Sequence, residues 1–394
     1  MSETINRKFQ AGKVSLIAFS HLSHDIYTAF LAPLLPLLID KLQFSYSMVG
    51  LLILILRMPS VISPLIGIIA DRMSTRYFVI FTPAVTAIAM SFIGNANSYE
   101  MLCLLLLIAG ISSAIYHVPS PVMISRVSGD RVGAGMSFYM LGGELARTLG
   151  PMIILAAVSL WGLEGAYRVI FLGPAASLVL FFRIRKISLK RDFKKQKRPQ
   201  SLKILLKKRK DVFIIAAALV SSKSFMIIAL TSFLPTYMTS KGADIWLAGA
   251  ALSVIELAGA AGTLLSGTLS DKIGRRKMLL MTTLTAPIIM IVFVFSSGWV
   301  VFPILIILGL LVFAVSPVIM AYVLDNEKDY PASANSIFMT LNFVSGSLIA
   351  LLFGFLGDAI NLDTTYIISA VLSLVAVPFI LKMPVNNGEV IMEM

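Results

Sequence analysis

Three titratable side chains cluster in the first apolar stretch of the chain: His21, His24 and Asp25. On a helix, positions i and i+4 share one face, so His21 and Asp25 are neighbours and His24 lies beside them. An imidazole held against a carboxylate can bind and release a proton, because each group changes the proton affinity of the other. Two other interpretations stay open: a polar cluster that only joins this helix to its neighbours, and a zinc site of two histidines and a carboxylate.

Five more charged residues occur near the middle of apolar stretches, where a charge without a partner is expensive. They are Arg57, Glu144, Arg147, Lys223 and Glu256. Glu144 and Arg147 are three residues apart and can form an ion pair within one helix, either permanent or exchanging partners. Arg57 and Lys223 have no acidic residue at helical spacing, so their partners must come from other helices or from an anionic ligand. A guanidinium group binds carboxylate or phosphate in a bidentate manner, which makes Arg57 the leading candidate for an anchor of a substrate anion.

The elements that must position these residues are membrane-spanning helices. Of the 394 residues 58% are hydrophobic and 13% are charged, whereas soluble proteins have about 25% charged residues. Apolar stretches of about 20 residues, enough to cross a bilayer, follow one another along the sequence. We expect twelve spanning helices, near 14–38, 46–70, 77–96, 101–124, 134–160, 166–182, 212–237, 245–269, 278–297, 299–323, 333–356 and 364–382.

The placement of the basic residues predicts the orientation. The net charge is +13, and 27 of the 33 Lys and Arg residues fall in segments that an N-terminus inside the cell makes cytoplasmic. This asymmetry follows the positive-inside rule, so we expect both termini in the cytoplasm. Residues 183–211 form a basic linker that we expect to lie on anionic lipid headgroups rather than to bind nucleic acid. The linker separates an N-terminal six-helix bundle, residues 1–182, from a C-terminal six-helix bundle, residues 212–394.

A short motif returns after the second span of each half. Residues 67–72 read GIIADR, and residues 267–272 read GTLSDK. The glycine allows close helix packing, and the aspartate can complement the N-terminus of a neighbouring helix. Both copies resemble the signature loop of the major facilitator superfamily, G-x-x-x-D-(R/K)-x-G-R-(R/K), although the first has Ser74 and Thr75 in place of the second glycine and the arginine. The predicted gating-loop residues are Gly67, Asp71, Arg72, Gly267, Asp271, Lys272, Gly274, Arg275 and Arg276.

This resemblance implies an all-α membrane protein of twelve helices in two pseudo-symmetric six-helix bundles, the parallel repeats of this superfamily. Residues 110–117 read GISSAIYH, and residues 142–151 begin with Gly-Gly and end with Gly-Pro. Together with the His/Asp group in the first span, they resemble the fosmidomycin-resistance branch of drug/proton exporters. Val118 and Pro119 replace the Pro-Glu that this branch has after the histidine, so the role of that glutamate has no counterpart here.

We therefore expect secondary active transport, with proton-coupled export of a small anionic or zwitterionic compound by alternating access, as a drug or metabolite antiporter. The alternative is a proton-coupled importer of an organic acid, amino acid or metal chelate. A membrane sensor or enzyme is the remote alternative, since the sequence has no nucleotide-binding loop, nucleophile elbow or zinc-protease motif. The expected partners are the small-molecule substrate, protons and the lipid bilayer, without a cofactor, resident metal or nucleic acid. We expect a monomer in the inner (cytoplasmic) membrane.

The internal repeat places polar residues at matching positions of the two halves. Asp25 corresponds to Lys223, and Glu144 to Asn342, at an offset of 198 residues. Asn342 could donate a hydrogen bond into a polar cavity between the helices or only bond a neighbouring helix. The predicted proton-coupling residues are Asp25, His21, His24, Glu144 and Glu256. The predicted substrate-binding residues are Arg57, His117, Arg147, Lys223 and Asn342.

Overall fold

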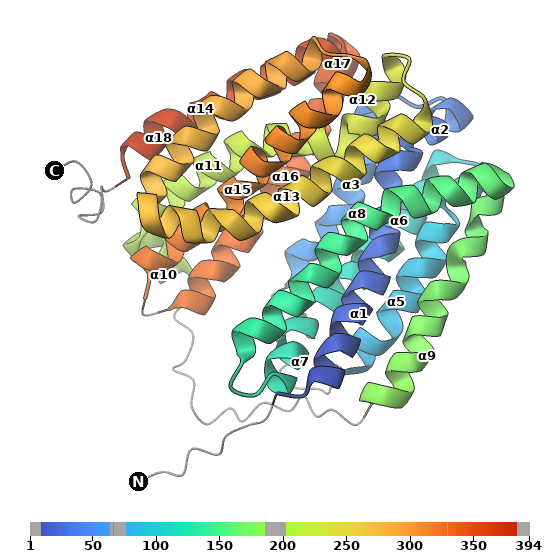
Figure 1. The fold of residues 1–394 in the computed structure, drawn as a ribbon, viewed down its shortest axis with the longest axis horizontal. Helices are drawn as coiled ribbons and strands as arrows, with labels where there is room; N and C mark the ends of the chain where they lie inside the picture. Colours follow the sequence, from blue (N-terminus) through green and yellow to red (C-terminus); the bar gives the residue numbers. More distant parts are fainter. Residues whose placement is uncertain (1–8, 64–65, 67–75, 186–201, 329, 384–394) are drawn as a thin grey trace. The chain divides into compact units, whose positions relative to one another are not determined.

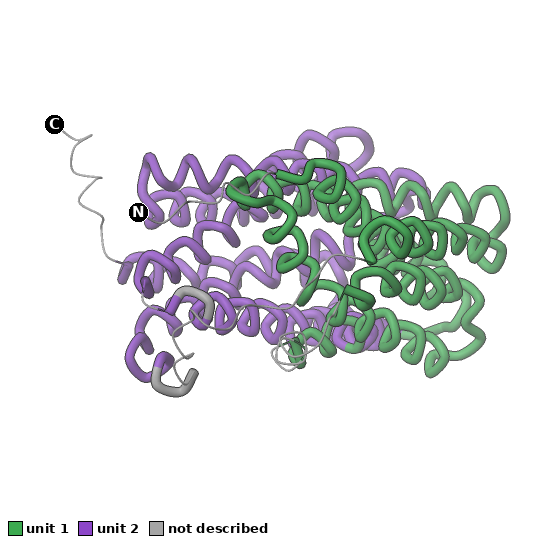
Figure 2. Tube along the Cα trace, turned by 90° about the horizontal axis from the view of Figure 1, so that it is seen from below, with its two compact units in different colours: residues 1–44, 55–193 green, residues 45–54, 194–394 purple. Residues whose placement is uncertain are grey.

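The computed structural model describes residues 9–63, 66, 76–185, 202–328 and 330–383, and all regular structure in these ranges is helical (Figure 1). The chain divides into two compact units (Figure 2). Unit 1 comprises Met1–Phe44 and Ile55–Phe193, and unit 2 comprises Ser45–Leu54 and Lys194–Met394. The main division therefore falls within the basic linker, and a short segment of the first half is grouped with the second.

Ten helical stretches of the described residues are long and apolar enough to cross a membrane, by their length and composition. Many of their large apolar side chains are exposed, and Phe171, Leu264 and Trp299 have exposed fractions of 73%, 70% and 79%. Such surfaces suit contact with lipid. The stretches are Ala11–Leu42, Arg76–Asn95, Tyr99–Val127, Val132–Ile184, Lys210–Ser240, Ile245–Ile273, Arg275–Val294, Gly298–Asn326, Ser333–Ala359 and Leu362–Leu381. The expected second span begins as the shorter helix Tyr46–Ile62, and most of its remainder lies outside the described residues.

The described helices of unit 1 pack as one bundle in which α1 lies against α8, α5 and α9. Proline ends several of them, because it has no backbone N–H to continue the helical hydrogen bonds. Pro119, for example, separates α6 from α7. The helices are α1 (Ala11–Thr28), α2 (Leu31–Leu42), α3 (Tyr46–Arg57, grouped with unit 2 up to Leu54), η1 (Met58–Ile62), α5 (Arg76–Ser91), η2 (Ile93–Asn95), α6 (Tyr99–His117), α7 (Ser120–Val127), α8 (Val132–Gly165), η3 (Ala166–Phe171) and α9 (Leu172–Ile184).

The stretch Val132–Ile184 contains both the fifth and the sixth expected spans. Its 53 residues would make a straight helix of ~80 Å, more than twice the ~30 Å thickness of a hydrocarbon core. The chain turns back at Gly162 instead, where φ is 73°. A residue with a side chain rarely adopts this conformation, so the glycine makes the turn possible. Figure 1 shows α8 and α9 as two separate limbs on either side of it.

Glycines on α8 set its distance from α1. A Cβ atom at Gly142 would lie 2.4 Å from the carbonyl oxygen of Ala18, and one at Gly143 would lie 2.6 Å from Cε1 of His21. A side chain at Gly142 would meet backbone, and one at Gly143 would meet the His21 ring. This close approach brings the inner face of α8 against the titratable residues of α1.

Unit 2 repeats the pattern of long antiparallel helices. The break predicted near residues 296–298 is present, since α14 ends at Val294 and α15 begins at Val301. The helices are α10 (Leu202–Lys208), α11 (Lys210–Ile228), the π-helix η5 (Ala229–Phe233), α12 (Leu234–Ser240), α13 (Ile245–Ile273), α14 (Arg275–Val294), η6 (Gly298–Val300), α15 (Val301–Asn326), α16 (Pro331–Ala359), α17 (Leu362–Ser373), η7 (Leu374–Ala376) and α18 (Val377–Leu381).

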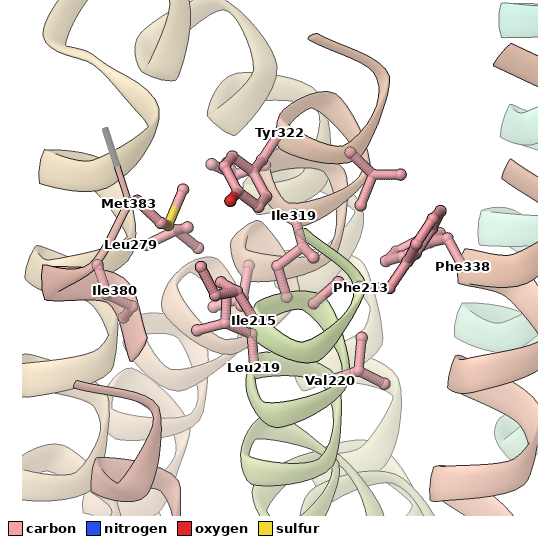
Figure 3. Close-up of a cluster of buried hydrophobic side chains, with 14 of the residues drawn as sticks. Phe213, Ile215, Leu219, Val220, Leu279, Ile319, Tyr322, Phe338, Ile380 and Met383 are labelled. Carbon is pink, nitrogen blue, oxygen red and sulfur yellow. The ribbon is translucent and has the colours of Figure 1, made fainter. Parts of the chain in front are cut away.

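The core of unit 2 is a cluster of buried apolar side chains from α11, α14, α15, α16 and α18, with Leu219, Leu279 and Ile319 at less than 2% exposure (Figure 3). The first part of α3 packs against α16, with Gly50 next to the backbone of Ala350. The carboxylate of Asp358, on α16, accepts hydrogen bonds of 2.8 Å from the backbone N–H groups of Tyr46 and Ser47. It therefore caps the N-terminus of α3, whose first N–H groups have no partner within the helix.

Candidate functional site

The carboxylate of Asp25 contacts three imidazole rings, and we call these four residues the Asp25 cluster. Nδ1 of His24 is 2.8 Å from Oδ1, Nε2 of His21 is 3.2 Å from Oδ2, and Nε2 of His117 is 3.3 Å from Oδ1. The contact between His21 and Asp25 was expected from their spacing on one helix. The third ring comes from the end of α6, where the sequence indicated only a substrate-binding residue. Asp25 and His24 are buried, while the side chain of His117 is 39% exposed.

Aromatic residues of neighbouring helices hold the rings in place. The ring of His21 stacks on Tyr139 of α8, with 4.0 Å between centroids and 12° between planes. The ring of His24 stacks on Tyr116 of α6 in the same way, at 4.3 Å and 9°. The small residues of α8 allow this packing, because a bulkier residue at Gly143 would displace the His21 ring. Rotation of either ring would therefore require the helices to move.

A chain of hydrogen bonds assigns the ring protons of His24. The Ser112 hydroxyl donates to the carbonyl oxygen of Thr82 (3.2 Å) and accepts from the Thr86 hydroxyl (2.8 Å). A hydroxyl has one hydrogen, so Thr86 must accept from Nε2–H of His24, 3.0 Å away. In a neutral ring, Nδ1 would then direct a lone pair at Oδ1 of Asp25. A proton must therefore lie in this contact, on His24 or on Asp25.

The same reasoning applies to His21. Its Nδ1 is 2.7 Å from the backbone carbonyl oxygen of Tyr139, which can only accept, so Nδ1 carries a hydrogen. In a neutral ring, Nε2 would direct a lone pair at Oδ2 of Asp25. A second proton must therefore lie in this contact.

The Asp25 cluster thus holds two protons more than an ionised carboxylate with neutral rings would hold. Either both rings are imidazolium and Asp25 is ionised, or Asp25 carries one of the two protons and only the ring that faces its other oxygen is imidazolium. Loss of either proton places two lone pairs opposite each other at about 3 Å, which is unfavourable in a buried site. The number of bound protons is therefore linked to the positions of α1 and its neighbours.

A metal ion is the other cation that this spacing accommodates. Ligand atoms of His21, Asp25 and His117 all lie within 4.8 Å of one another, and zinc takes histidine and carboxylate ligands. Protons alone satisfy the observed contacts of Asp25 with His21 and His24. The hydrogen bonds therefore require no ion beyond them.

Glu144, which directly follows the glycines that contact α1, forms an ion pair with Arg147 on α8. Their side chains are 16% and 39% exposed. Arg57 is the last residue of α3 and is partly buried. These three residues and the Asp25 cluster are the predicted site residues of unit 1.

In unit 2 the predicted residues lie on three helices. Lys223 of α11 donates to the Ser316 hydroxyl of α15 and lines a small cavity. Glu256 is buried on α13, at 5% exposure. The amide of Asn342 on α16 donates to the carbonyl oxygen of Phe338 in its own helix, at 2.9 Å. This bond stays within one helix, so it decides between neither of the two interpretations of Asn342.

The second signature loop forms a network of ion pairs. Arg275 contacts Asp271 (2.5 Å) and Asp325 (3.3 Å), and Arg276 donates to the carbonyl oxygen of Met383 (3.4 Å). Gly274 has φ of 92° and lets the chain turn from α13 to α14 before Arg275. Close packing was expected at the first glycine of this motif, but no described atom lies within 4 Å of a Cβ built at Gly267. Lys272 follows Asp271 in the last turn of α13. The first-copy residues Gly67, Asp71 and Arg72 lie outside the described residues.

Sequence reasoning missed the groups that orient the histidines. Tyr116 occurs in the stretch 110–117 that carries the family resemblance, and Tyr139 lies three residues before the stretch 142–151. A search for ring-stacking partners in and beside these stretches would have found both. Thr86 and Ser112 contribute through hydroxyls that many spanning helices contain, and no pattern marks Thr86. Only the contact across α1, α5 and α6 shows their role.

Comparison with known proteins places the chain in a large group of transporters. The sequence profile of the Major Facilitator Superfamily matches residues 17–350. The Fosmidomycin resistance protein of Escherichia coli (strain K12) is 24% identical over 378 residues, which cover 95% of this chain and 93% of that protein. The uncharacterized MFS-type transporter YfnC of Bacillus subtilis (strain 168) is 25% identical over 374 residues, with 92% and 90% covered.

Solved structures share the fold at lower identity. The inward-facing, unoccupied structure of a bacterial homologue of the human lysosomal transporter Spinster has a TM-score of 0.80 and 15% identity, with 96% of this chain and 97% of that chain covered. A D-xylose–proton symporter has a TM-score of 0.77 and 15% identity, with 97% and 99% covered. The likeness concerns the fold of the whole chain.

Proposed function

This chain belongs to the major facilitator superfamily, and we propose that it couples proton binding at the Asp25 cluster to the export of a small anionic or zwitterionic compound. It is a multi-pass membrane protein with the fold of a secondary transporter. The proposed cycle is alternating access, with both termini in the cytoplasm and no enzymatic step. Export, rather than import, is supported by the similarity to a protein named for fosmidomycin resistance.

The observation that carries the proton coupling is the pair of contacts between Asp25 and the rings of His21 and His24. Each contact requires one proton, and both rings are held by fixed hydrogen bonds on their other nitrogen. When the protons leave, the present packing of the rings is no longer favourable. A conformational change that moves the rings away from Asp25 then removes the repulsion between their lone pairs. Proton loss is thereby linked to movement of the helices.

The substrate contacts that we propose are Arg57, His117, Arg147 and Asn342, with Glu144 and Glu256 as acidic partners that exchange during the cycle. His117 is the natural link between the two tasks. Its ring contacts Asp25, and its side chain is the most exposed of the Asp25 cluster. An anion that pairs with the imidazolium form of His117 would compete with Asp25 for it, so substrate binding and proton binding would influence each other.

The test is flux in proteoliposomes that contain the purified protein, with fosmidomycin as the probe and an imposed pH gradient. Asp25→Asn keeps the size of the side chain and removes its titration. We expect gradient-driven flux to collapse in this variant, while exchange of labelled for unlabelled fosmidomycin without a gradient continues. Asp40→Asn, an exposed aspartate on α2, is the matched control.

Gradient-driven flux in Asp25→Asn at the level of Asp40→Asn would exclude the proposed coupling site. Fosmidomycin flux that ignores the pH gradient in the unmodified protein would exclude proton coupling itself. If fosmidomycin moves in the same direction as the protons, import replaces export in the proposal, and the coupling site is unaffected.

A further inference from the structure

Unit 2 contains a small cavity between α11, α14, α15 and the end of α17, and among the described residues Lys223 is the only charged one that lines it. The free space admits a group of about the size of a water molecule. Most of the walls are apolar, with three hydroxyl groups among them. The lining residues are Leu219, Lys223, Met226, Thr282, Thr283, Ala286, Pro287, Val312, Val315, Ser373 and Ala376.

The ammonium group of Lys223 is only partly satisfied. One N–H donates to the Ser316 hydroxyl, and in the part of the chain that the structure describes neither of the other two has an acceptor. No described carboxylate lies within 4.0 Å of Nζ. A cation in an apolar environment without a counter-charge is expensive to keep. Either the cavity supplies an anion, or the amine stays neutral.

The hydroxyl groups of the cavity differ in what they can offer. Thr282 donates its hydrogen to backbone carbonyl oxygens one turn earlier, and Ser373 donates to the carbonyl oxygen of Ala370. The hydroxyl of Thr283 has no hydrogen-bond partner among the described residues, although the residue is only 8% exposed. Because this residue lines the cavity, its hydroxyl is available to donate to a ligand there.

We infer that this cavity binds one small monovalent anion, such as chloride, between Lys223 and Thr283. One ammonium N–H group and the Thr283 hydroxyl then find an acceptor, and the charge of Lys223 is balanced. A single cation balances a single negative charge, so a dianion such as phosphate or a phosphonate would leave the opposite excess. The apolar walls favour an anion that gives up its water readily, as halides do. The small space excludes a bulky organic acid.

This anion site is separate from the proposed transport function, because it needs neither protons nor substrate. Its effect is to hold α11, α14 and α15 together through one shared ion. Lys223 corresponds to Asp25 in the internal repeat, so the two units solve the same problem with opposite charges: unit 1 balances a carboxylate with protons, and unit 2 balances an ammonium with an anion.

The test is thermal unfolding of the purified protein in detergent at constant ionic strength, with sodium bromide, chloride or acetate replacing sodium gluconate. We expect a saturable rise in melting temperature with bromide and chloride. Thr283→Val removes one donor and should weaken bromide affinity about five-fold. Thr285→Val, the same change on the exposed side of α14, is the matched control and should leave the affinity unchanged.

Lys223→Met removes the charge, so its melting temperature should not depend on bromide and should exceed that of the unmodified protein in gluconate. A crystal soaked in bromide should show one anomalous scatterer beside Lys223. Stabilisation by acetate but not by halides would identify a small carboxylate as the monovalent anion. Equal melting temperatures of the unmodified protein in all four salts, or an undiminished bromide effect in Lys223→Met, would overturn the inference.

Discussion

Replacing the adjacent glycines of α8 by alanine should separate stability from proton binding. A Cβ atom at Gly142 would lie 2.4 Å from the backbone oxygen of Ala18, and ordinary contact needs about 3.4 Å. The two helices must therefore separate by roughly 1.0 Å, because backbone cannot move aside. Overpacking of this kind costs about 1–3 kcal/mol, so Gly142→Ala should lower the melting temperature.

Gly143→Ala meets a side chain instead. Its Cβ would lie 2.6 Å from Cε1 of His21, so the ring must shift by roughly 0.8 Å away from α8. The bond from Nδ1 to the carbonyl oxygen of Tyr139 then lengthens from 2.7 Å to about 3.5 Å, where little of a hydrogen bond remains. The freed ring can carry its hydrogen on Nε2, donate to Asp25 while neutral, and so bind one proton fewer. We expect a stability loss of only ~1 kcal/mol but a loss of proton-driven flux.

The two effects are measured separately. Thermal unfolding of the purified variants reports the stability, and nuclear magnetic resonance of nitrogen-labelled histidine reports which nitrogen of His21 carries hydrogen. Gly133→Ala is the control, since nothing lies within 4 Å of a Cβ at this position of α8. The reasoning is refuted if Gly142→Ala is as stable as Gly133→Ala, or if Gly143→Ala keeps the Nδ1–H signal of His21 and full coupling.

Three further changes test other parts of the structure. Thr86→Val removes the acceptor of Nε2–H of His24, so the ring can donate to Asp25 while neutral; proton release on deprotonation, measured with a pH dye, should fall from two to one. Asp358→Ala removes the cap of α3 and should lower the free energy of unfolding by ~1–2 kcal/mol in thermal unfolding, whereas an unchanged value would exclude a stabilising cap. Burial of Glu327 acts to raise its pKa, but bonds from Arg209 and from a backbone N–H outweigh burial, and its pKa lies below the usual 4.5. Its contribution to stability is therefore present above pH 4.5 and lost as pH falls further, so Glu327→Gln should flatten that acid loss in a pH series of melting temperatures.

Local features of the sequence were enough to locate the helices. A spanning helix depends on about 20 consecutive apolar residues, and this property is independent of what the helix later contacts. The break between α14 and α15 follows from Ser296, Ser297 and Gly298, and the shared face of His21 and Asp25 follows from helical spacing. The signature loops and the family resemblance predicted how the helices are arranged, because short contiguous motifs can be recognised without knowledge of the fold.

The candidate site depended on contacts between distant parts of the chain. Tyr139 is 118 residues from His21, and Thr86 is 62 residues from His24, so no periodicity connects them. The count of protons in the Asp25 cluster follows only from these bonds, since they decide which nitrogen of each ring carries hydrogen.

Lys223 shows the same division between sequence and tertiary structure. From the sequence it was a cation in need of an acidic partner or an anionic ligand, and its partner could lie on any helix. The packing of α11 against α14 and α15 places it in a cavity with the Thr283 hydroxyl and without a described carboxylate nearby. The sequence determined that these charges lie within apolar helices, because this depends on neighbouring residues along the chain. Tertiary structure decided what balances each charge, because an ion pair, a proton or a bound anion depends on atoms that only folding brings within reach.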